Sequence, residues 1–190
     1  MKYIIGGFGV IIVVATFIAL IVAFVGRDPI PDDDTAVDDR IVIRELVDED
    51  SEVVYTTSGR IIADEEYRTI RITVSDSQRR FEILRGYNLA VDERVDLPNT
   101  SAAYEEFLHA LEQAGYGNVV EGESTSEQGK CPTNRRHVYR VILDGEEAIR
   151  SWSSPCRGER GNFGGNSRLV ERLFQGQIPE YRERIRGLRI

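Results

Sequence analysis

Hydrophobic and polar positions divide the chain into three parts. The first part is an apolar run that begins at Tyr3, ends at Val25 and contains no charged side chain. A helix rises ~1.5 Å per residue, so this run spans about 34 Å and can cross a hydrocarbon core of about 30 Å. We therefore predict a transmembrane anchor over residues 1–26, an acidic linker over 27–39 and a folded domain over 40–190.

The charges beside the apolar run predict its orientation in a lipid bilayer. The amino terminus and Lys2 precede the run, and Arg27 follows it. The positive-inside rule therefore favours a single-pass protein with its amino terminus inside and its domain outside the cell membrane. A cleaved export signal is disfavoured, because such signals have a shorter apolar region of about 7 to 15 residues and a small-residue cleavage site.

A pilin-like filament subunit is an alternative. The stretch GGFG resembles a prepilin cleavage point between Gly7 and Phe8. However, Ile12 stands where pilin-like subunits carry a glutamate, and Pro29 and Pro31 end the helix soon after the apolar run. Cleavage after Gly7 in the mature protein would favour this alternative.

Three small residues share one face of the predicted anchor. Ala15, Ala19 and Ala23 recur every four residues, so they stack along one side of a helix. Such a stripe lets a second helix approach closely and makes self-association of the anchor a hypothesis. The alternative is chance, because alanine is common in membrane-spanning helices.

The linker combines prolines with aspartates in the stretch GRDPIPDDDTAVDD. This composition predicts an extended, hydrated segment that holds the domain away from the bilayer. The aspartates lack the spacing of a calcium-binding loop, so we expect no metal here.

Within the domain, β-branched residues and alternating polarity predict strands. Residues 40–47 and 52–57 form one pair of such segments, and residues 67–75 and 79–87 form another. Each pair is joined by a short polar connection, which indicates two antiparallel hairpins.

Residues 98–118 change to helical spacing. Phe107, Leu108 and Leu111 fall on one face, and Asn99 or Thr100 can cap the start. The predicted fold class is therefore α+β, with an antiparallel sheet of about five or six strands and two or three packed helices.

A third hairpin is predicted between the two cysteines. Asp144 and Gly145 are a strong signal for a two-residue turn. Counting outward from this turn brings Cys131 and Cys156 within two residues of register on one face, which suits the Cα separation of about 4.4 to 6.8 Å that a disulfide needs. We predict this disulfide, and with it an oxidising compartment.

The same register gives predictions for the nearby aromatic and histidine residues. His137 is expected to face Trp152, and the tryptophan is expected in the core. Two sulfurs and His137 do not complete a zinc site, and the cysteine spacing is not that of a redox C-x-x-C pair. We therefore expect no metal or other cofactor, and we interpret His109 as a surface residue.

A glycine-rich loop, CRGERGNFGGNS, leads into a helix near Asn166 or Ser167. Backbone N–H groups at such a junction can bind an anion, and Arg157 and Arg160 would reinforce this site. The alternative is a plain loop whose last residues cap the helix, because the nucleotide-binding glycine motifs are absent.

Arginines also gather in the predicted last helix. Arg182, Arg186 and Arg189 lie mostly on one side of it, and Arg182 and Arg186 above all are candidate contacts for an anionic envelope polymer, a lipid headgroup or a protein partner. The net charge of −8 combines an acidic stretch over residues 28–66 with an arginine-rich stretch over 131–190. Solvated faces explain this asymmetry, so no nucleic acid is expected.

The apolar run, together with CPTNRRHVYRV, SWSSPCRGERGNFGG and LFQGQIPEY, resembles uncharacterised single-pass membrane-anchored envelope proteins of small-genome bacteria. The resemblance implies a bacterial envelope setting and no particular chemistry. We predict a binding or scaffolding domain of a cell-envelope assembly that contacts an envelope protein or a second copy of itself. The alternative is an envelope enzyme with a site assembled from distant residues, which leaves no local motif.

Overall fold

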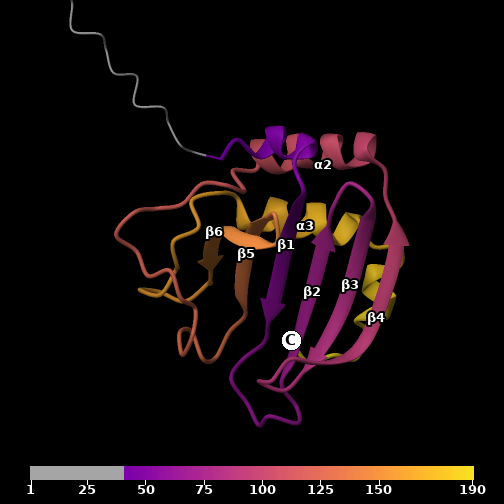
Figure 1. Ribbon diagram of the computed structural model, residues 1–190. Coiled ribbons are helices and arrows are strands. Elements are labelled where there is room, and N and C mark those ends of the chain that lie inside the picture. Colours follow the sequence, from indigo (N-terminus) through magenta and orange to yellow (C-terminus); the bar gives the residue numbers. More distant parts are fainter. Residues whose placement is uncertain (1–40) are drawn as a thin grey trace, which may run out of the picture. The chain divides into compact units, whose positions relative to one another are not determined.

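One antiparallel sheet organises the domain, with its strands in the order β4-β3-β2-β1-β5-β6 (Figure 1). The computed structural model describes residues 41–190. Consecutive strands pair with each other except β4 and β5, because β5 pairs with β1, which lies between β2 and β5. The strands are β1 (Ser51–Ser58), β2 (Arg68–Val74), β3 (Gln78–Arg85), β4 (Ala90–Pro98), β5 (Arg136–Leu143) and β6 (Glu146–Ser153).

Helices cover one face of this sheet. They are the 3₁₀ helix η1 (Ile43–Asp48) and the α-helices α2 (Ser101–Gln113), α3 (Ser167–Gly176) and α4 (Tyr181–Arg184). The oxygen of Thr100 caps α2 by accepting from the N–H of Ala103, and Asn166 caps α3 by accepting from the N–H of Leu169. These caps satisfy N–H groups that have no partner inside a helix.

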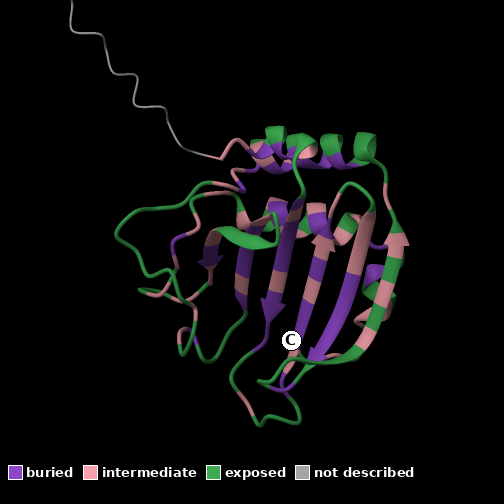
Figure 2. Ribbon diagram, in the orientation of Figure 1, coloured by how far each residue is buried: buried purple, intermediate pink, exposed green. Residues whose placement is uncertain are grey.

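The core lies between the helices and alternate residues of the strands. Because successive side chains of a strand point to opposite faces, Val53 and Tyr55 of β1 face the helices while Val54 faces away. Phe174 of α3 packs against Tyr55 and Phe107, with ring centroids 5.4 and 5.1 Å apart. Figure 2 shows the resulting alternation of buried and partly exposed positions along the strands.

Several sequence predictions are confirmed. The fold is α+β with an antiparallel sheet. The hairpin predicted over residues 67–87 is β2 and β3, the helix predicted over 98–118 is α2, and the hairpin with the turn at Asp144 and Gly145 is β5 and β6. His109 is exposed, as expected.

The hairpin predicted from residues 40–47 is wrong. Residues Ile43–Asp48 form the 3₁₀ helix η1, which packs against α2. Ile43 and Leu46 are both buried, and their spacing of three residues matches the period of a 3₁₀ helix. Burial against a neighbouring helix therefore overrides the β-propensity of this apolar segment.

The register predicted for the third hairpin is also wrong. Beyond a bulge, each residue of β5 faces a residue of β6 one position away from the predicted one. A shift between Val141 and Ile142 makes Val138 face Trp152 and makes His137 face Ser153. Because one residue of slip reverses the face, Trp152 and His137 point to opposite sides of the sheet. The tryptophan is buried as predicted, and its indole N–H donates to the carbonyl of Ser124 at 2.6 Å.

The predicted disulfide is present. Cys131 and Cys156 are bonded, with their Cα atoms 5.7 Å apart. The bond joins the segment before β5 to the segment after β6, so it ties together the open ends of this hairpin.

Several predictions concern residues outside the described part of the chain. These are the transmembrane anchor, its orientation, the prepilin-like GGFG stretch, the acidic linker, and the stripe of Ala15, Ala19 and Ala23. Within residues 41–190, no helix combines the length and the apolar character needed to cross a lipid bilayer.

Candidate functional site

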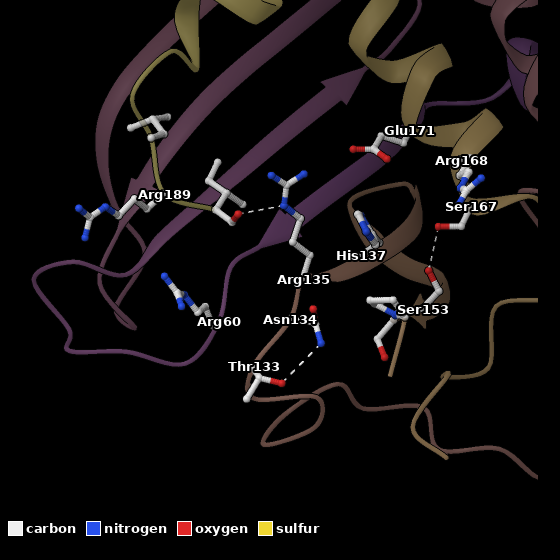
Figure 3. Close-up of a pocket in the computed structure, with 14 residues that line it drawn as sticks. Arg60, Thr133, Asn134, Arg135, His137, Ser153, Ser167, Arg168, Glu171 and Arg189 are labelled. Carbon is white, nitrogen blue, oxygen red and sulfur yellow. Dashed lines mark hydrogen bonds between the residues drawn. The ribbon is translucent and has the colours of Figure 1, made fainter. Parts of the chain in front are cut away.

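A pocket of about 720 Å³ lies on the helix-covered side of the sheet, between the ends of β5 and β6 and the start of α3 (Figure 3). We call it the arginine pocket. Its lining comes from the connection after β1, both ends of the disulfide-linked hairpin, α3 and the last residues of the chain. The lining residues are Arg60, Thr133, Asn134, Arg135, His137, Ser153, Ser154, Pro155, Ser167, Arg168, Glu171, Leu188, Arg189 and Ile190.

Four arginines from separate segments reach this pocket: Arg60, Arg135, Arg168 and Arg189. Within residues 41–190, none of the four forms an ion pair with an acidic side chain. Arg135 donates from Nε to the main-chain oxygen of Ile190 at 2.9 Å. Among these residues Glu171 is the one acidic side chain of the lining, so the side chains make the pocket electropositive.

Strand alternation decides which of two adjacent arginines enters the pocket. Arg135 precedes β5 and shares a face with His137, whereas Arg136 between them points to the other side. There Arg136 is buried and donates to the carbonyl of Gly59 at 2.6 Å and to the hydroxyl of Tyr67 at 3.2 Å. Arg136 is therefore structural, while Arg135 remains at the pocket wall.

His137 is a neutral group of the lining. Burial, followed by the nearby charge of Arg135, lowers the pKa of His137 to about 4. Its Nδ1 lies 2.7 Å from the hydroxyl of Tyr55, and burial raises the pKa of that phenol, so the phenol keeps its proton. The phenol can thus donate to Nδ1, which leaves the imidazole proton on Nε2 as a donor for a ligand.

Three hydroxyl groups meet beside His137. The hydroxyl of Tyr139 lies 2.9 Å from that of Ser153 and 2.6 Å from that of Ser167, and the two serines are 3.0 Å apart. Burial raises the pKa of Tyr139 to about 12, so all three groups are neutral donors. Ser167 is the first residue of α3, so the hydroxyls lie where the helix dipole favours negative charge.

This arrangement suits the binding of an anion. Guanidinium groups form paired, charge-assisted hydrogen bonds with phosphate and carboxylate oxygens, and hydroxyl groups can add further donors. The pocket is less suited to a serine nucleophile, because the Ser153 hydroxyl bonds to Tyr139 and Ser167 and forms no hydrogen bond with His137. Among residues 41–190, no group of acidic, histidine or cysteine side chains is placed to hold a metal ion.

The arginines singled out from the sequence lie elsewhere. Arg157 and Arg160 are exposed on the loop between β6 and α3 and do not line the arginine pocket. Arg182 lines a smaller pocket of about 390 Å³ beside α4, and Arg186 lies 3.3 Å from Glu183. Their role as anion or partner contacts stays a prediction.

Sequence reasoning found one part of the arginine pocket and missed the rest. The glycine-rich loop indicated that the start of α3 could face an anion, and Ser167 and Arg168 do line the pocket. Arg60 and Arg135 were missed because they lie far from the glycine-rich loop and from each other in the sequence, and Arg189 was considered only as part of the last helix. Their convergence depends on the pairing of β1 with β5 and on the path of the last residues, and no local pattern encodes either.

Comparisons of the chain with protein-family models, curated proteins and solved structures find no match.

Proposed function

We propose that the chain is a membrane-anchored binding protein of the bacterial cell envelope, whose domain holds an anionic ligand in the arginine pocket. The observation that carries this proposal is the convergence on one cavity of four arginines that have no acidic side-chain partner within residues 41–190. Gathering like charges is unfavourable unless an opposite charge offsets it, so the arrangement favours a bound anion. In a cell-envelope assembly, the domain would act as a scaffold that captures an anionic component.

The cellular setting is part of the same proposal. The apolar run from Tyr3 to Val25 would hold the chain in the bilayer, with the domain on the outer side. The disulfide supports this placement, because such bonds persist in oxidising compartments. The stripe of Ala15, Ala19 and Ala23 would allow a second copy to associate through the anchor.

An enzyme is the second candidate, because His137, Ser153 and Glu171 line the same pocket as the arginines. General acid–base groups and an anion-binding wall are components of hydrolytic sites. Two features weigh against turnover. Burial lowers the pKa of His137 to about 4, which is poorly matched to a general base at neutral pH. The hydroxyl of Ser153 forms a hydrogen bond with Ser167 and not with His137.

Calorimetric titration of the full-length chain in detergent with inorganic pyrophosphate tests the proposal. We expect saturable binding at one site per chain. Replacing Arg60 and Arg168 by alanine together should weaken binding about 100-fold, since each charge-assisted contact contributes about tenfold. Neither arginine holds another described side chain in place, so the fold should persist.

Arg172→Ala is the matched control. Arg172 lies on α3, one turn after Arg168, but it lines the smaller pocket instead. Its replacement should leave pyrophosphate affinity unchanged. Equal effects of Arg168→Ala and Arg172→Ala would show general charge attraction and contradict the proposal. Release of phosphate during the titration would favour the enzyme.

A further inference from the structure

We infer that the ligand of the arginine pocket is a phosphate monoester of a polyhydroxy compound, such as a sugar or polyol phosphate. This inference rests on the proposed anion-binding function and adds the chemical class of the ligand. Three features of the lining carry it: an excess of guanidinium groups, unused hydrogen-bond acceptors, and the lack of a flat aromatic wall.

The charge of the lining fits a dianion. Four guanidinium groups face one carboxylate side chain, and His137 is neutral near pH 7, so the side chains of the lining have an excess of three positive charges. A phosphate monoester carries close to two negative charges at this pH and presents three terminal oxygens to paired donors. A monocarboxylate offers one charge and two oxygens, so it would leave more of these arginines unpaired.

The lining also presents hydrogen-bond acceptors to a ligand. The Glu171 carboxylate accepts from Gln175 through Oε1 at 3.0 Å, and its Oε2 has no partner within residues 41–190. The side-chain oxygen of Asn134 likewise has none among these residues, because its contacts at 3.5 and 3.6 Å both use Nδ2. A carboxylate beside a bound anion is repulsive unless the ligand also brings hydroxyl groups that donate to it.

Arginines reach the pocket from both sides, whereas its one acidic side chain lies on the α3 side. Arg60 and Arg189 lie away from α3 and Arg135 lies between, while Arg168, Ser167 and Glu171 lie on the α3 side (Figure 3). A ligand with its phosphate at Arg60, Arg135 and Arg189 would direct its hydroxyl-bearing carbons towards Glu171 and Arg168. The volume of about 720 Å³ exceeds what a bare phosphate needs and falls in the usual range for organic ligands.

The remaining walls disfavour a nucleotide. His137 is the only ring of the lining that can stack on a base, and its Nδ1 is held by Tyr55. Pro155, Leu188 and Ile190 supply small aliphatic surfaces instead. Saturated carbon skeletons pack against such surfaces, whereas bases are usually held between flat π-systems.

Titration of the full-length chain in detergent with four probes tests the ligand class. The probes are sorbitol 6-phosphate, inorganic phosphate, gluconate and adenosine 5′-monophosphate. We expect sorbitol 6-phosphate to bind at least about tenfold more tightly than each of the others, because it alone combines a dianionic phosphate with hydroxyl groups for Glu171 and carries no base. Equal or tighter binding of gluconate, of inorganic phosphate or of the nucleotide would overturn the assignment.

Glu171→Ala gives a second test, because it should change the binding affinities of two probes in opposite directions. Loss of the acceptor should weaken sorbitol 6-phosphate about tenfold, while loss of the negative charge should strengthen inorganic phosphate severalfold. A merely electrostatic role would strengthen both, and a folding defect would weaken both. Glu105→Ala, at an exposed position of α2, is the matched control and should change neither affinity.

The panel separates failure of this inference from failure of the proposed function. If none of the probes and no pyrophosphate binds, the pocket is not an anion site and both fail. If gluconate and inorganic phosphate bind as tightly as sorbitol 6-phosphate, the anion site stands and only the ligand class is wrong. If a poly(glycerol phosphate) chain binds more tightly than sorbitol 6-phosphate, the ligand is a phosphodiester polymer and not a monoester.

Discussion

The arginines of the arginine pocket and those on the face of the sheet away from the helices differ in their partners. On that face, Arg71 and Arg94 lie 3.5 and 2.6 Å from the carboxylate of Glu82, and Arg80 lies 2.7 Å from that of Asp96. In the arginine pocket on the other face, the four guanidinium groups have no acidic side-chain partner within residues 41–190.

This difference separates the ion-paired arginines from those that we propose bind a ligand. Glu82 is only 2% exposed, and burial lowers the pKa of Arg71, so each group depends on its partner to remain charged at low cost. For Arg80 the hydrogen bond with Asp96 has the larger effect and raises the pKa. The pocket arginines are exposed and retain their hydrogen-bond capacity for a ligand. Pairing, rather than the presence of arginine, therefore distinguishes the two roles.

Removal of the disulfide is expected to have the largest effect. Replacing Cys131 and Cys156 by serine opens a link across 25 residues and should lower the free energy of unfolding by about 3.5 kcal/mol. Urea unfolding followed by the fluorescence of Trp152, which is buried, measures this change. The segments beside both cysteines line the arginine pocket, so pyrophosphate affinity should fall as well. Unchanged stability and affinity would show that the bond is dispensable.

Glu82→Gln should disrupt the ion pairs on the face of the sheet away from the helices and leave the arginine pocket intact. The change leaves the partly buried Arg71 without compensation and should cost about 3 kcal/mol of unfolding free energy. The same urea titration measures it. Asp96→Asn is the milder control, because that pair is more exposed and should cost about 0.5 kcal/mol. Loss of pyrophosphate binding in Glu82→Gln would contradict the separation of the two faces.

A smaller effect is expected from His137 when the pH is lowered. Its folded pKa of about 4 lies below the usual value near 6.5, so the unfolded chain binds the proton more readily. The contribution of neutral His137 to the free energy of unfolding is therefore complete above pH 6.5 and is lost as the pH falls towards 4. The loss should be about 2 kcal/mol after allowance for partial exposure.

Comparison of wild type with His137→Gln isolates this contribution. Glutamine keeps an acceptor for Tyr55 but does not titrate, so the difference in stability between the two proteins should depend on pH between 4 and 6.5. A constant difference across this range would show that His137 is not held neutral by the fold.

Much of the fold follows from local sequence patterns. Residues 67–87 give the β2–β3 hairpin because Ile70, Ile72 and Val74 alternate with polar residues, and residues 98–118 give α2 because their apolar positions recur at helical spacing. Asp144 and Gly145 give the turn of β5 and β6. These elements are encoded within short windows, so they could be predicted.

The remaining features depend on contacts between distant segments. The apolar residues Ile43 and Leu46 become a 3₁₀ helix because α2 offers a surface, and the bulge next to Val141 changes which residues face each other. The arginine pocket also depends on tertiary structure, namely on the pairing of β1 with β5 and on the placement of α3. Sequence therefore predicted one helix start at the site but not the arginines around it.

Nuclear magnetic resonance of the arginine Nε–Hε groups tests the central claim most directly. Inorganic pyrophosphate would be titrated into the ¹⁵N-labelled full-length chain in detergent, with single Arg→Lys variants assigning each signal. The account predicts saturable shifts for Arg60, Arg135, Arg168 and Arg189, with none for Arg71, Arg80 and Arg94. Shifts of similar size in both groups, or none in the first group, would contradict it.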